Sequence, residues 1–154
     1  MENQPPLSDT NDFHIQPAEA IEIDAVCSLY DSVGWSIYTK DPNQLMKAIT
    51  GSDFLVTALE GGQLIGLARA LSDDSTIAYV QDILVRPTHQ GRGVGRGLLK
   101  AILDRYRHVR QKVLLTDDRP EQLRFYDSMG FQNTRELSQT PLNAFVLYEG
   151  VRLS

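Results

Sequence analysis

The chain has 154 residues, 42% of them hydrophobic, and a formal net charge of −5. This length predicts one globular domain, and the apolar fraction excludes a disordered or low-complexity chain. No run approaches the roughly 18 apolar residues that cross a bilayer, and no basic start precedes an apolar core at the N-terminus. We therefore expect a cytoplasmic protein without a membrane partner, with a flexible tail over 1–11 and a single domain over 12–154.

Charge is unevenly distributed along the chain. Residues 1–80 carry 3 basic and 12 acidic side chains, whereas residues 81–154 carry 12 basic and 8 acidic ones. Within 86–112 the single acidic residue, Asp104, stands among eight basic ones. This surplus predicts a polyanionic ligand, while the overall acidity argues against nucleic acid as a partner. A solvated helix face is the alternative interpretation.

The N-terminal part predicts a short edge strand followed by two helices. The strand is expected at 13–17. Apolar residues recur at helical spacing over 18–33, and the following Gly34 suits a left-handed helix end. Asp41 before Pro42 is typical of a helix N-cap and predicts a second helix that Gly51 ends.

The middle of the chain changes to β character. Gly61 and Gly62 separate two apolar, β-branched runs and predict a hairpin turn. A third run follows after a polar turn, so an antiparallel meander is expected. Its three strands are predicted at 54–60, 63–71 and 75–85. A broad apolar stripe then predicts a helix over 93–107 that packs on the sheet, and KVLLT at 112–116 predicts a short buried strand.

The C-terminal part predicts one more helix and two more strands. Asp118, with Glu121 three residues later, is typical of a capping box and predicts a helix that ends at Met129. The strands are expected at 131–137 and 143–150. Helices and strands in this order predict an α+β (mixed α/β) fold with helices on the faces of a mixed sheet.

The segment 80–103, VQDILVRPTHQGRGVGRGLLKAIL, predicts a strand that runs into a glycine-rich turn and then a helix. Small residues allow the backbone to approach a ligand, and a helix N-terminus offers unpaired N–H groups and a positive dipole end. The spacing excludes two other phosphate motifs. A P-loop needs Lys-Ser or Lys-Thr, and the dinucleotide fingerprint needs a third small residue where this chain has Arg96.

The run 90–95, QGRGVG, resembles the Q/R-x-x-G-x-G/A signature of the GNAT superfamily of acetyl-CoA-dependent N-acetyltransferases. The strand YVQDILVRP before it, the helix GRGLLKAIL after it and the later FYDSMGF resemble family segments in the family's order. The resemblance is close over 78–131 and looser over 13–149. It implies one N-acetyltransferase domain with a central, mostly antiparallel mixed sheet of about six to seven strands, flanked by about four helices.

The resemblance also implies acetyl-CoA as cosubstrate. In the family, the strand backbone pairs with the pantetheine arm and polarises the thioester carbonyl, while loop amides hold the pyrophosphate. The residues implied to bind it are Ile83, Leu84, Val85, Gln90, Gly91, Arg92, Gly93, Val94, Gly95 and Arg96. Core packing is a second role for the strand residues.

Two residues are candidates for the chemistry. Tyr126 matches the family tyrosine that protonates the departing thiolate, which suits a phenol with a pKa of about 10; packing between helix and sheet is the alternative. Some family members have Glu-Asp where this chain has Gln81-Asp82. Because Gln81 cannot act as a base, Asp82 is the expected base through water, with a substrate-anchoring or structural role as an equal alternative.

The segment after the first helix is where family members place substrate contacts. Trp35 and Tyr38, in this segment, are therefore expected to bind substrate, and Gln81 on the predicted strand is the third expected substrate-binding residue. The two aromatic rings form either a wall for an amine or a hydrophobic anchor for the loop. The three histidines lack ligand spacing, so no metal site is expected.

The leading hypothesis is transfer of an acetyl group from acetyl-CoA to a primary amine of a small molecule or peptide by direct attack. A homodimer is left open. The alternative is a catalytically weak CoA-binding regulatory module, which the replacement of the family's Glu by Gln81 permits.

Overall fold

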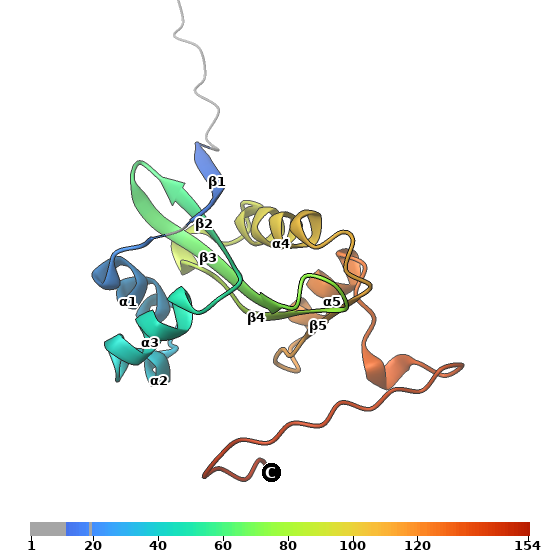
Figure 1. Ribbon diagram of the computed structural model, residues 1–154. Helices are drawn as coiled ribbons and strands as arrows, with labels where there is room; N and C mark the ends of the chain where they lie inside the picture. The colour runs from blue at the N-terminus through green and yellow to red at the C-terminus, as the bar shows by residue number, and fades with distance from the viewer. Residues whose placement is uncertain (1–11, 19) are drawn as a thin grey trace, which may run out of the picture. The chain divides into compact units, whose positions relative to one another are not determined.

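The computed structural model (Figure 1) describes residues 12–18 and 20–154. By its internal contacts the chain divides into two compact units. The first unit ends at Leu115, and the second comprises Thr116–Ser154. The tail predicted over 1–11 lies outside the described residues, and the single domain over 12–154 stays a prediction.

The first unit contains a sheet of five strands. In chain order these are β1 (Phe13–Pro17), β2 (Phe54–Glu60), β3 (Gln63–Ser72), β4 (Ile77–Val85) and β5 (Gln111–Leu114). The same order holds across the sheet, with β1 to β4 antiparallel to their neighbours and β5 parallel to β4. This confirms the mixed, mostly antiparallel sheet, the edge strand and the meander.

The helices also follow the predicted order, with some differences in extent. They are α1 (Ile23–Ser32), α2 (Ser36–Thr39), α3 (Pro42–Thr50), α4 (Val94–Arg105) and α5 (Pro120–Ser128), with 3-10 turns at Pro87–His89 and Thr134–Glu136. Helix α1 begins later than predicted, and α2 was not predicted. The Asp41 side chain accepts a hydrogen bond from Gln44 N at 3.1 Å, which confirms the predicted N-cap of α3.

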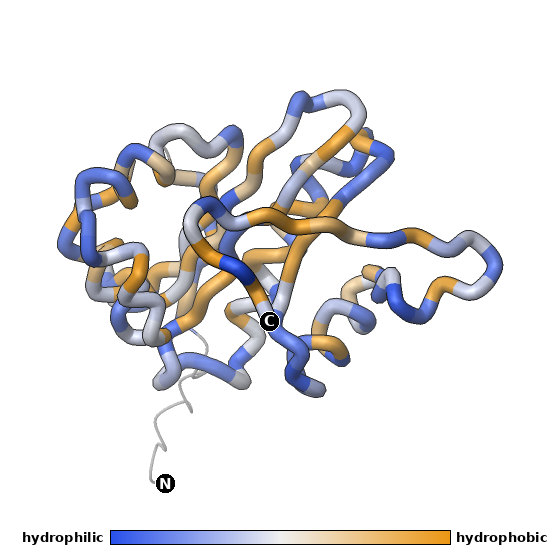
Figure 2. Tube along the Cα trace, turned by 90° about the horizontal axis from the view of Figure 1, so that it is seen from below, coloured by the Kyte–Doolittle hydropathy of each residue, from blue (hydrophilic) through white to orange (hydrophobic). Residues whose placement is uncertain are grey.

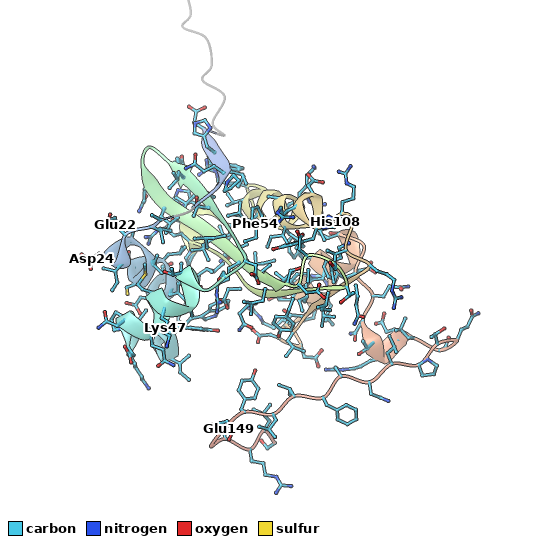
Figure 3. All side chains as sticks on the ribbon, in the orientation of Figure 1. Glu22, Asp24, Lys47, Phe54, His108 and Glu149 are labelled. Atoms are coloured by element: carbon cyan, nitrogen blue, oxygen red, sulfur yellow. The ribbon has the colours of Figure 1, made fainter. Side chains whose placement is uncertain are left out.

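Helices cover both faces of the sheet in the first unit (Figure 1). Helix α4 packs on one face through a buried stripe that includes Leu98 and Ile102, as its sequence pattern predicts. Phe54, labelled in Figure 3, packs edge-on against Tyr106 with ring centroids 6.1 Å apart beside that layer. Helices α1 and α3 cover the opposite face through Val26, Leu45 and other apolar residues.

A β-bulge in β4 changes which side chains face each layer. Arg69 of β3 is opposite Asp82, but the next residue, Ala70, is opposite Val80, so Gln81 is an extra residue without a partner on β3. Val80 belongs to the α4 layer, whereas Leu84 belongs to the layer of α1 and α3. The bulge therefore turns Asp82 toward α1 and α3, where strict alternation from Val80 would have turned it toward α4.

The second unit departs from the predicted pattern. The strands expected at 131–137 and 143–150 are absent from the described structure, so the sheet has five strands instead of six to seven. A 3-10 turn occupies part of the first segment. In the second segment Tyr148 forms one isolated β-bridge, with Val151 just beyond the segment's end. Figure 2 shows that this C-terminal run is apolar, and Phe145 is 95% exposed. An apolar run does not form a strand without a partner for its backbone.

The predicted capping box at Asp118 is also wrong. The N-cap of α5 is Arg119, with no side-chain hydrogen bond to the helix. Asp118 instead forms an ion pair with Arg135 at 3.3 Å. Pro120 in the first turn supplies the local start signal, because its fixed φ suits a helix that begins there.

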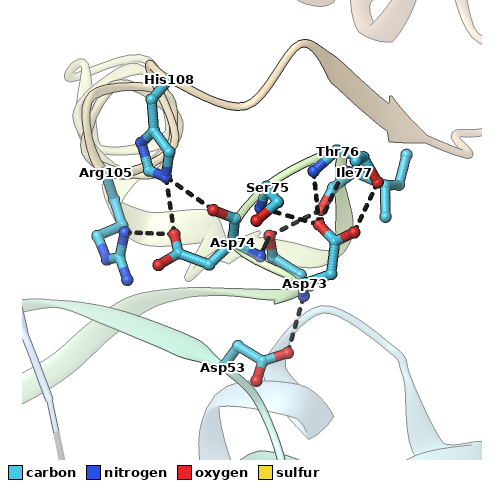
Figure 4. A network of polar contacts seen from close by, with 9 residues as sticks. Asp53, Asp73, Asp74, Ser75, Thr76, Ile77, Arg105 and His108 are labelled. Atoms are coloured by element: carbon cyan, nitrogen blue, oxygen red, sulfur yellow. Dashed lines mark hydrogen bonds and ion pairs between the residues drawn. The ribbon is translucent and has the colours of Figure 1, made fainter.

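The turn between β3 and β4 is organised by two neighbouring aspartates (Figure 4). The carboxylate of Asp73 accepts hydrogen bonds from the backbone N–H groups of Ser75, Thr76 and Ile77 at 2.8 to 3.0 Å, and from the Thr76 hydroxyl at 2.6 Å. Asp74 accepts from Arg105 at the end of α4. The hydroxyl and backbone donors lower the pKa of Asp73.

Replacing Asp73 with Ala should lower the melting temperature at pH 7, because four donors of the turn lose their acceptor. Since the folded-state pKa is lowered, the stabilisation is present above the unfolded pKa of about 4 and is lost as pH falls below it. Thermal unfolding at pH 7 and pH 3 should therefore show a smaller difference from the unsubstituted protein at pH 3.

Asp24→Ala is the matched control, because Asp24 is exposed on α1 (Figure 3). A loss of stability for Asp73→Ala that is no larger than the control, or that is independent of pH, would contradict this role of Asp73.

Candidate functional site

The glycine-rich loop leads into the N-terminus of α4 in an open conformation. Gly91 and Gly93 have φ angles of +78° and +85°, in the left-handed region that favours glycine. No neighbouring heavy atom lies within 4 Å of where a Cβ would stand at either position. Gly93 is the N-cap of α4, and no side chain caps the helix in the described structure. The first-turn amides and the helix dipole are therefore available to an anion.

The other predicted loop residues have distinct positions. Gln90 donates through Nε2 to the Val85 carbonyl at 3.1 Å and so links the loop to the end of β4. Val94 is 1% exposed and packs in the α4 layer, so its side chain anchors the helix. Gly95 and Arg96 lie in the first turn of α4, and Arg96 is exposed.

The side chains of Arg92 and His89, beside the loop, are both held by Glu60, at the end of β2. Arg92 donates to both oxygens of Glu60, from Nη1 at 2.9 Å and from Nη2 at 3.3 Å. His89 Nε2 lies 2.9 Å from Glu60 Oε2. The Arg92 hydrogen bonds lower the pKa of Glu60. Glu60 therefore fixes the position of Arg92 next to the glycine loop.

Strand β4 extends beyond its pairing with β5. The two strands pair only along Ile77–Val80 of β4, so in the described part of the first unit residues 81–85 have a strand partner on the β3 side alone. Ile83 and Val85 pack partly buried on the α4 layer, while Leu84 is buried on the other face. Backbone groups along this stretch are positioned to accept a further extended partner, as the predicted pantetheine contact requires.

The most buried charged side chains of the described structure are Asp82, within this stretch, and Arg69, opposite it on β3. Asp82 is 2% exposed and Arg69 is 6% exposed. Arg69 Nε donates to Asp82 Oδ2 at 2.6 Å, the Tyr30 hydroxyl donates to the same oxygen at 2.8 Å, and the Tyr38 hydroxyl donates to Oδ1 at 3.2 Å. Burial and the Asp82 charge raise the pKa of both tyrosines, which keeps them protonated. Because Asp82 is buried and its carboxylate accepts these three hydrogen bonds, it has no direct access to solvent.

The three predicted substrate residues are brought together around this network. Tyr38 lies on α2, and Gln81 Nε2 donates to its hydroxyl oxygen at 3.4 Å. The Tyr38 ring contacts the Trp35 and Tyr30 rings, with centroids 6.0 Å and 5.2 Å away. Trp35 is half-buried against the layer of α1 and α3, which favours the anchoring interpretation of that side chain. Tyr38 and Gln81 remain partly exposed.

Tyr126 lies in the second unit, on α5. Its ring packs against Phe125 and Phe131, with centroids 5.0 Å and 6.0 Å away. Burial and the nearby Asp117 raise the pKa of the Tyr126 hydroxyl, so the phenol holds its proton at neutral pH. The hydroxyl is therefore in the protonation state that a general acid needs.

Sequence reasoning missed Arg69, Tyr30 and Glu60. For Arg69 a signal was present, because it is one charge within the apolar run LIGLARAL of β3, and a charge buried in a strand needs a partner. Tyr30 and Glu60 carried no comparable signal. Their partners, Asp82 and Arg92, are 52 and 32 residues away along the chain.

Two searches of the described residues gave negative results. They contain no cluster of three or more His, Cys, Asp or Glu side chains that could hold a metal ion. None of the helices found in them has the length and apolar character of a membrane span.

Comparisons with known proteins agree with this geometry. A model of the acetyltransferase (GNAT) family matches residues 21–131. The uncharacterized N-acetyltransferase ycf52 of Gracilaria tenuistipitata var. liui is 34% identical over 110 residues, which cover 67% of this chain and 58% of that protein.

Solved structures show the same fold. The GNAT family acetyltransferase SP0256 from Streptococcus pneumoniae TIGR4 is 28% identical, with a TM-score of 0.74 over 89% of this chain and 98% of that one. AAC(6')-Iy, solved with a CoA bisubstrate analogue, has a TM-score of 0.66 at 17% identity over 86% of this chain and 99% of that one. The chain therefore belongs to the acetyltransferase (GNAT) family and is an acyl-CoA-dependent acetyltransferase.

Proposed function

We propose that the protein transfers the acetyl group of acetyl-CoA to a primary amine of a small molecule or peptide. The observation that carries this proposal is the stretch 81–85 of β4, paired only with β3 in the first unit, which leads into the uncapped N-terminus of α4. An extended thioester arm fits the first part and a pyrophosphate fits the second. The CoA analogue bound to AAC(6')-Iy supports the same cosubstrate.

The transfer is a direct displacement. The lone pair of the neutral amine attacks the thioester carbonyl carbon, so a C–N bond forms and the C–S bond breaks. The sulfur leaves with the bonding electrons, and the amine nitrogen loses one proton to solvent. Backbone N–H groups of β4 stabilise the negative charge that develops on the carbonyl oxygen.

Tyr126 supplies the proton that the departing thiolate takes up, and solvent then restores it. The phenol is protonated at neutral pH, as a proton donor must be. Asp82 acts as a positioning residue. Its carboxylate already accepts three hydrogen bonds, and its side chain is 1% exposed, so it meets the acceptor only through Tyr38.

One observation favours a second candidate, a CoA-binding regulatory module with weak turnover. The position that holds Glu in some family members holds Gln81, and the neighbouring carboxylate is already ion-paired. Release of free thiol from acetyl-CoA in the presence of an amine panel separates the two candidates. Amine-dependent thiol release supports the enzyme, and binding of acetyl-CoA without such release supports the regulatory module.

Gly93→Val should weaken acetyl-CoA binding by at least about tenfold. A β-branched residue at φ +85° costs roughly 1–2 kcal/mol, so the loop relaxes and its amides move. No atom lies within 4 Å of the new Cβ, so the fold should persist. Calorimetric titration with acetyl-CoA measures the effect. Gly62→Val is the matched control, because Gly62 also has a positive φ and open space but lies in the β2–β3 turn. Equal affinities of the two variants would remove the glycine loop from the site.

Tyr126→Phe should lower kcat by roughly 10² to 10⁴ while acetyl-CoA binding is retained, because only the proton donor is lost. The aromatic packing with Phe125 and Phe131 remains, so stability should change little. Steady-state thiol release measures kcat. Tyr148→Phe, at an exposed tyrosine of the same unit, is the control. A kcat that matches the control would reduce Tyr126 to a packing role.

A further inference from the structure

Gln81 occupies a special place in the sheet. It is the extra residue of the β4 bulge, so β3 offers it no partner. Val80 and Asp82 on either side are buried, whereas Gln81 is partly exposed. A bulge that re-aims a single side chain beside a functional site is a recurrent use of this irregularity.

Hydrogen-bond direction in the network determines how the Gln81 amide is oriented. A carboxylate only accepts, so Tyr38 commits its one hydroxyl hydrogen to Asp82. The Tyr38 oxygen can then only accept from Gln81, and the Gln81 atom that faces it at 3.4 Å must be the nitrogen. The reverse amide orientation would place two acceptor oxygens in contact. The buried ion pair therefore fixes the orientation of a partly exposed amide.

This orientation leaves two acceptors at the edge of the network. One is the Gln81 carbonyl oxygen Oε1, to which no described residue donates a hydrogen bond. The other is the remaining lone pair of the Tyr38 oxygen. Both acceptors belong to uncharged groups, and the Asp82 carboxylate behind them is paired with Arg69.

We propose that Gln81 Oε1 and the Tyr38 oxygen accept the two N–H groups of the neutral primary amine and so direct its lone pair to the thioester. Gln81 and Tyr38 are then specificity-determining residues. Asp82 is the positioning residue, because it accepts the hydroxyl hydrogen of Tyr38 and so leaves the Tyr38 oxygen as an acceptor. This inference rests on the proposed function. It predicts a preference for primary over secondary amines, because a neutral secondary amine has one N–H for the two acceptors.

The test measures kcat/KM with benzylamine and with N-methylbenzylamine, at saturating acetyl-CoA, for the full chain and its variants. Two further pairs are putrescine with N,N′-dimethylputrescine, and a glycyl peptide with its N-methyl form. We expect Gln81→Leu to reduce the preference for the primary amine by about tenfold, the equivalent of a hydrogen bond of about 1.4 kcal/mol. The loss should appear in the KM for the amine, with the KM for acetyl-CoA unchanged. Tyr38→Phe should change the same ratio in the same direction.

Gln16→Leu is the matched control, because Gln16 is exposed on β1, at the edge of the sheet away from β4. Should Gln81→Leu fail to fold, Gln81→Asn makes the same test with a shorter amide. An unchanged preference in the Gln81 and Tyr38 variants of an active enzyme overturns this inference and leaves the proposed function standing. Absence of thiol release with every amine, in a protein that binds acetyl-CoA, overturns the proposed function itself.

Discussion

The ion pair between Arg69 and Asp82 is the constraint on which the first unit depends. It joins β3 to β4 at the bulge, and Arg69 also donates to Ala48 and Ser52 at the end of α3. Removing one partner of a buried pair typically costs about 3–5 kcal/mol, because the other charge is left without compensation. The pair therefore links the bulge of β4 to the end of α3.

The same pair orders the polar groups around it. Asp82 accepts from two tyrosines, and those tyrosines belong to α1 and α2, so the loop between the helices is tied to the sheet by hydrogen bonds as well as by aromatic contacts. Near the N-terminus of α4, Glu60 holds Arg92 and His89 beside the glycine loop. In both places a carboxylate fixes the direction of the polar side chains around it.

The sequence predicted those features that depend on local pattern. The meander, α4 and the N-cap at Asp41 follow from periodicity and backbone preferences, which are properties of a few adjacent residues. The features that the sequence predicted wrongly, or did not reveal, depend on contacts with residues that are distant along the chain. The run 143–150 has the composition of a strand, yet a strand exists only where another backbone pairs with it. Likewise, Tyr38 and Gln81 were chosen by resemblance and aromatic character, but their hydrogen-bond direction is set by Asp82, which is 44 residues away from Tyr38 along the chain.

Under the proposed function, the network also bears on how the amine becomes nucleophilic. An alkylamine with a pKa near 10 is only about one part in a thousand neutral at pH 7, and the ammonium form has no lone pair to attack with. An ionised carboxylate next to the amine would raise the amine's pKa further by stabilising the ammonium. Glutamine at position 81 avoids this penalty while it still accepts an N–H, and Arg69 screens the Asp82 charge behind it. A neutral hydrogen-bond acceptor therefore favours the neutral amine, which is the reactive form of the substrate. Gln81 in place of the family's Glu is thus compatible with turnover in which solvent takes the amine's proton.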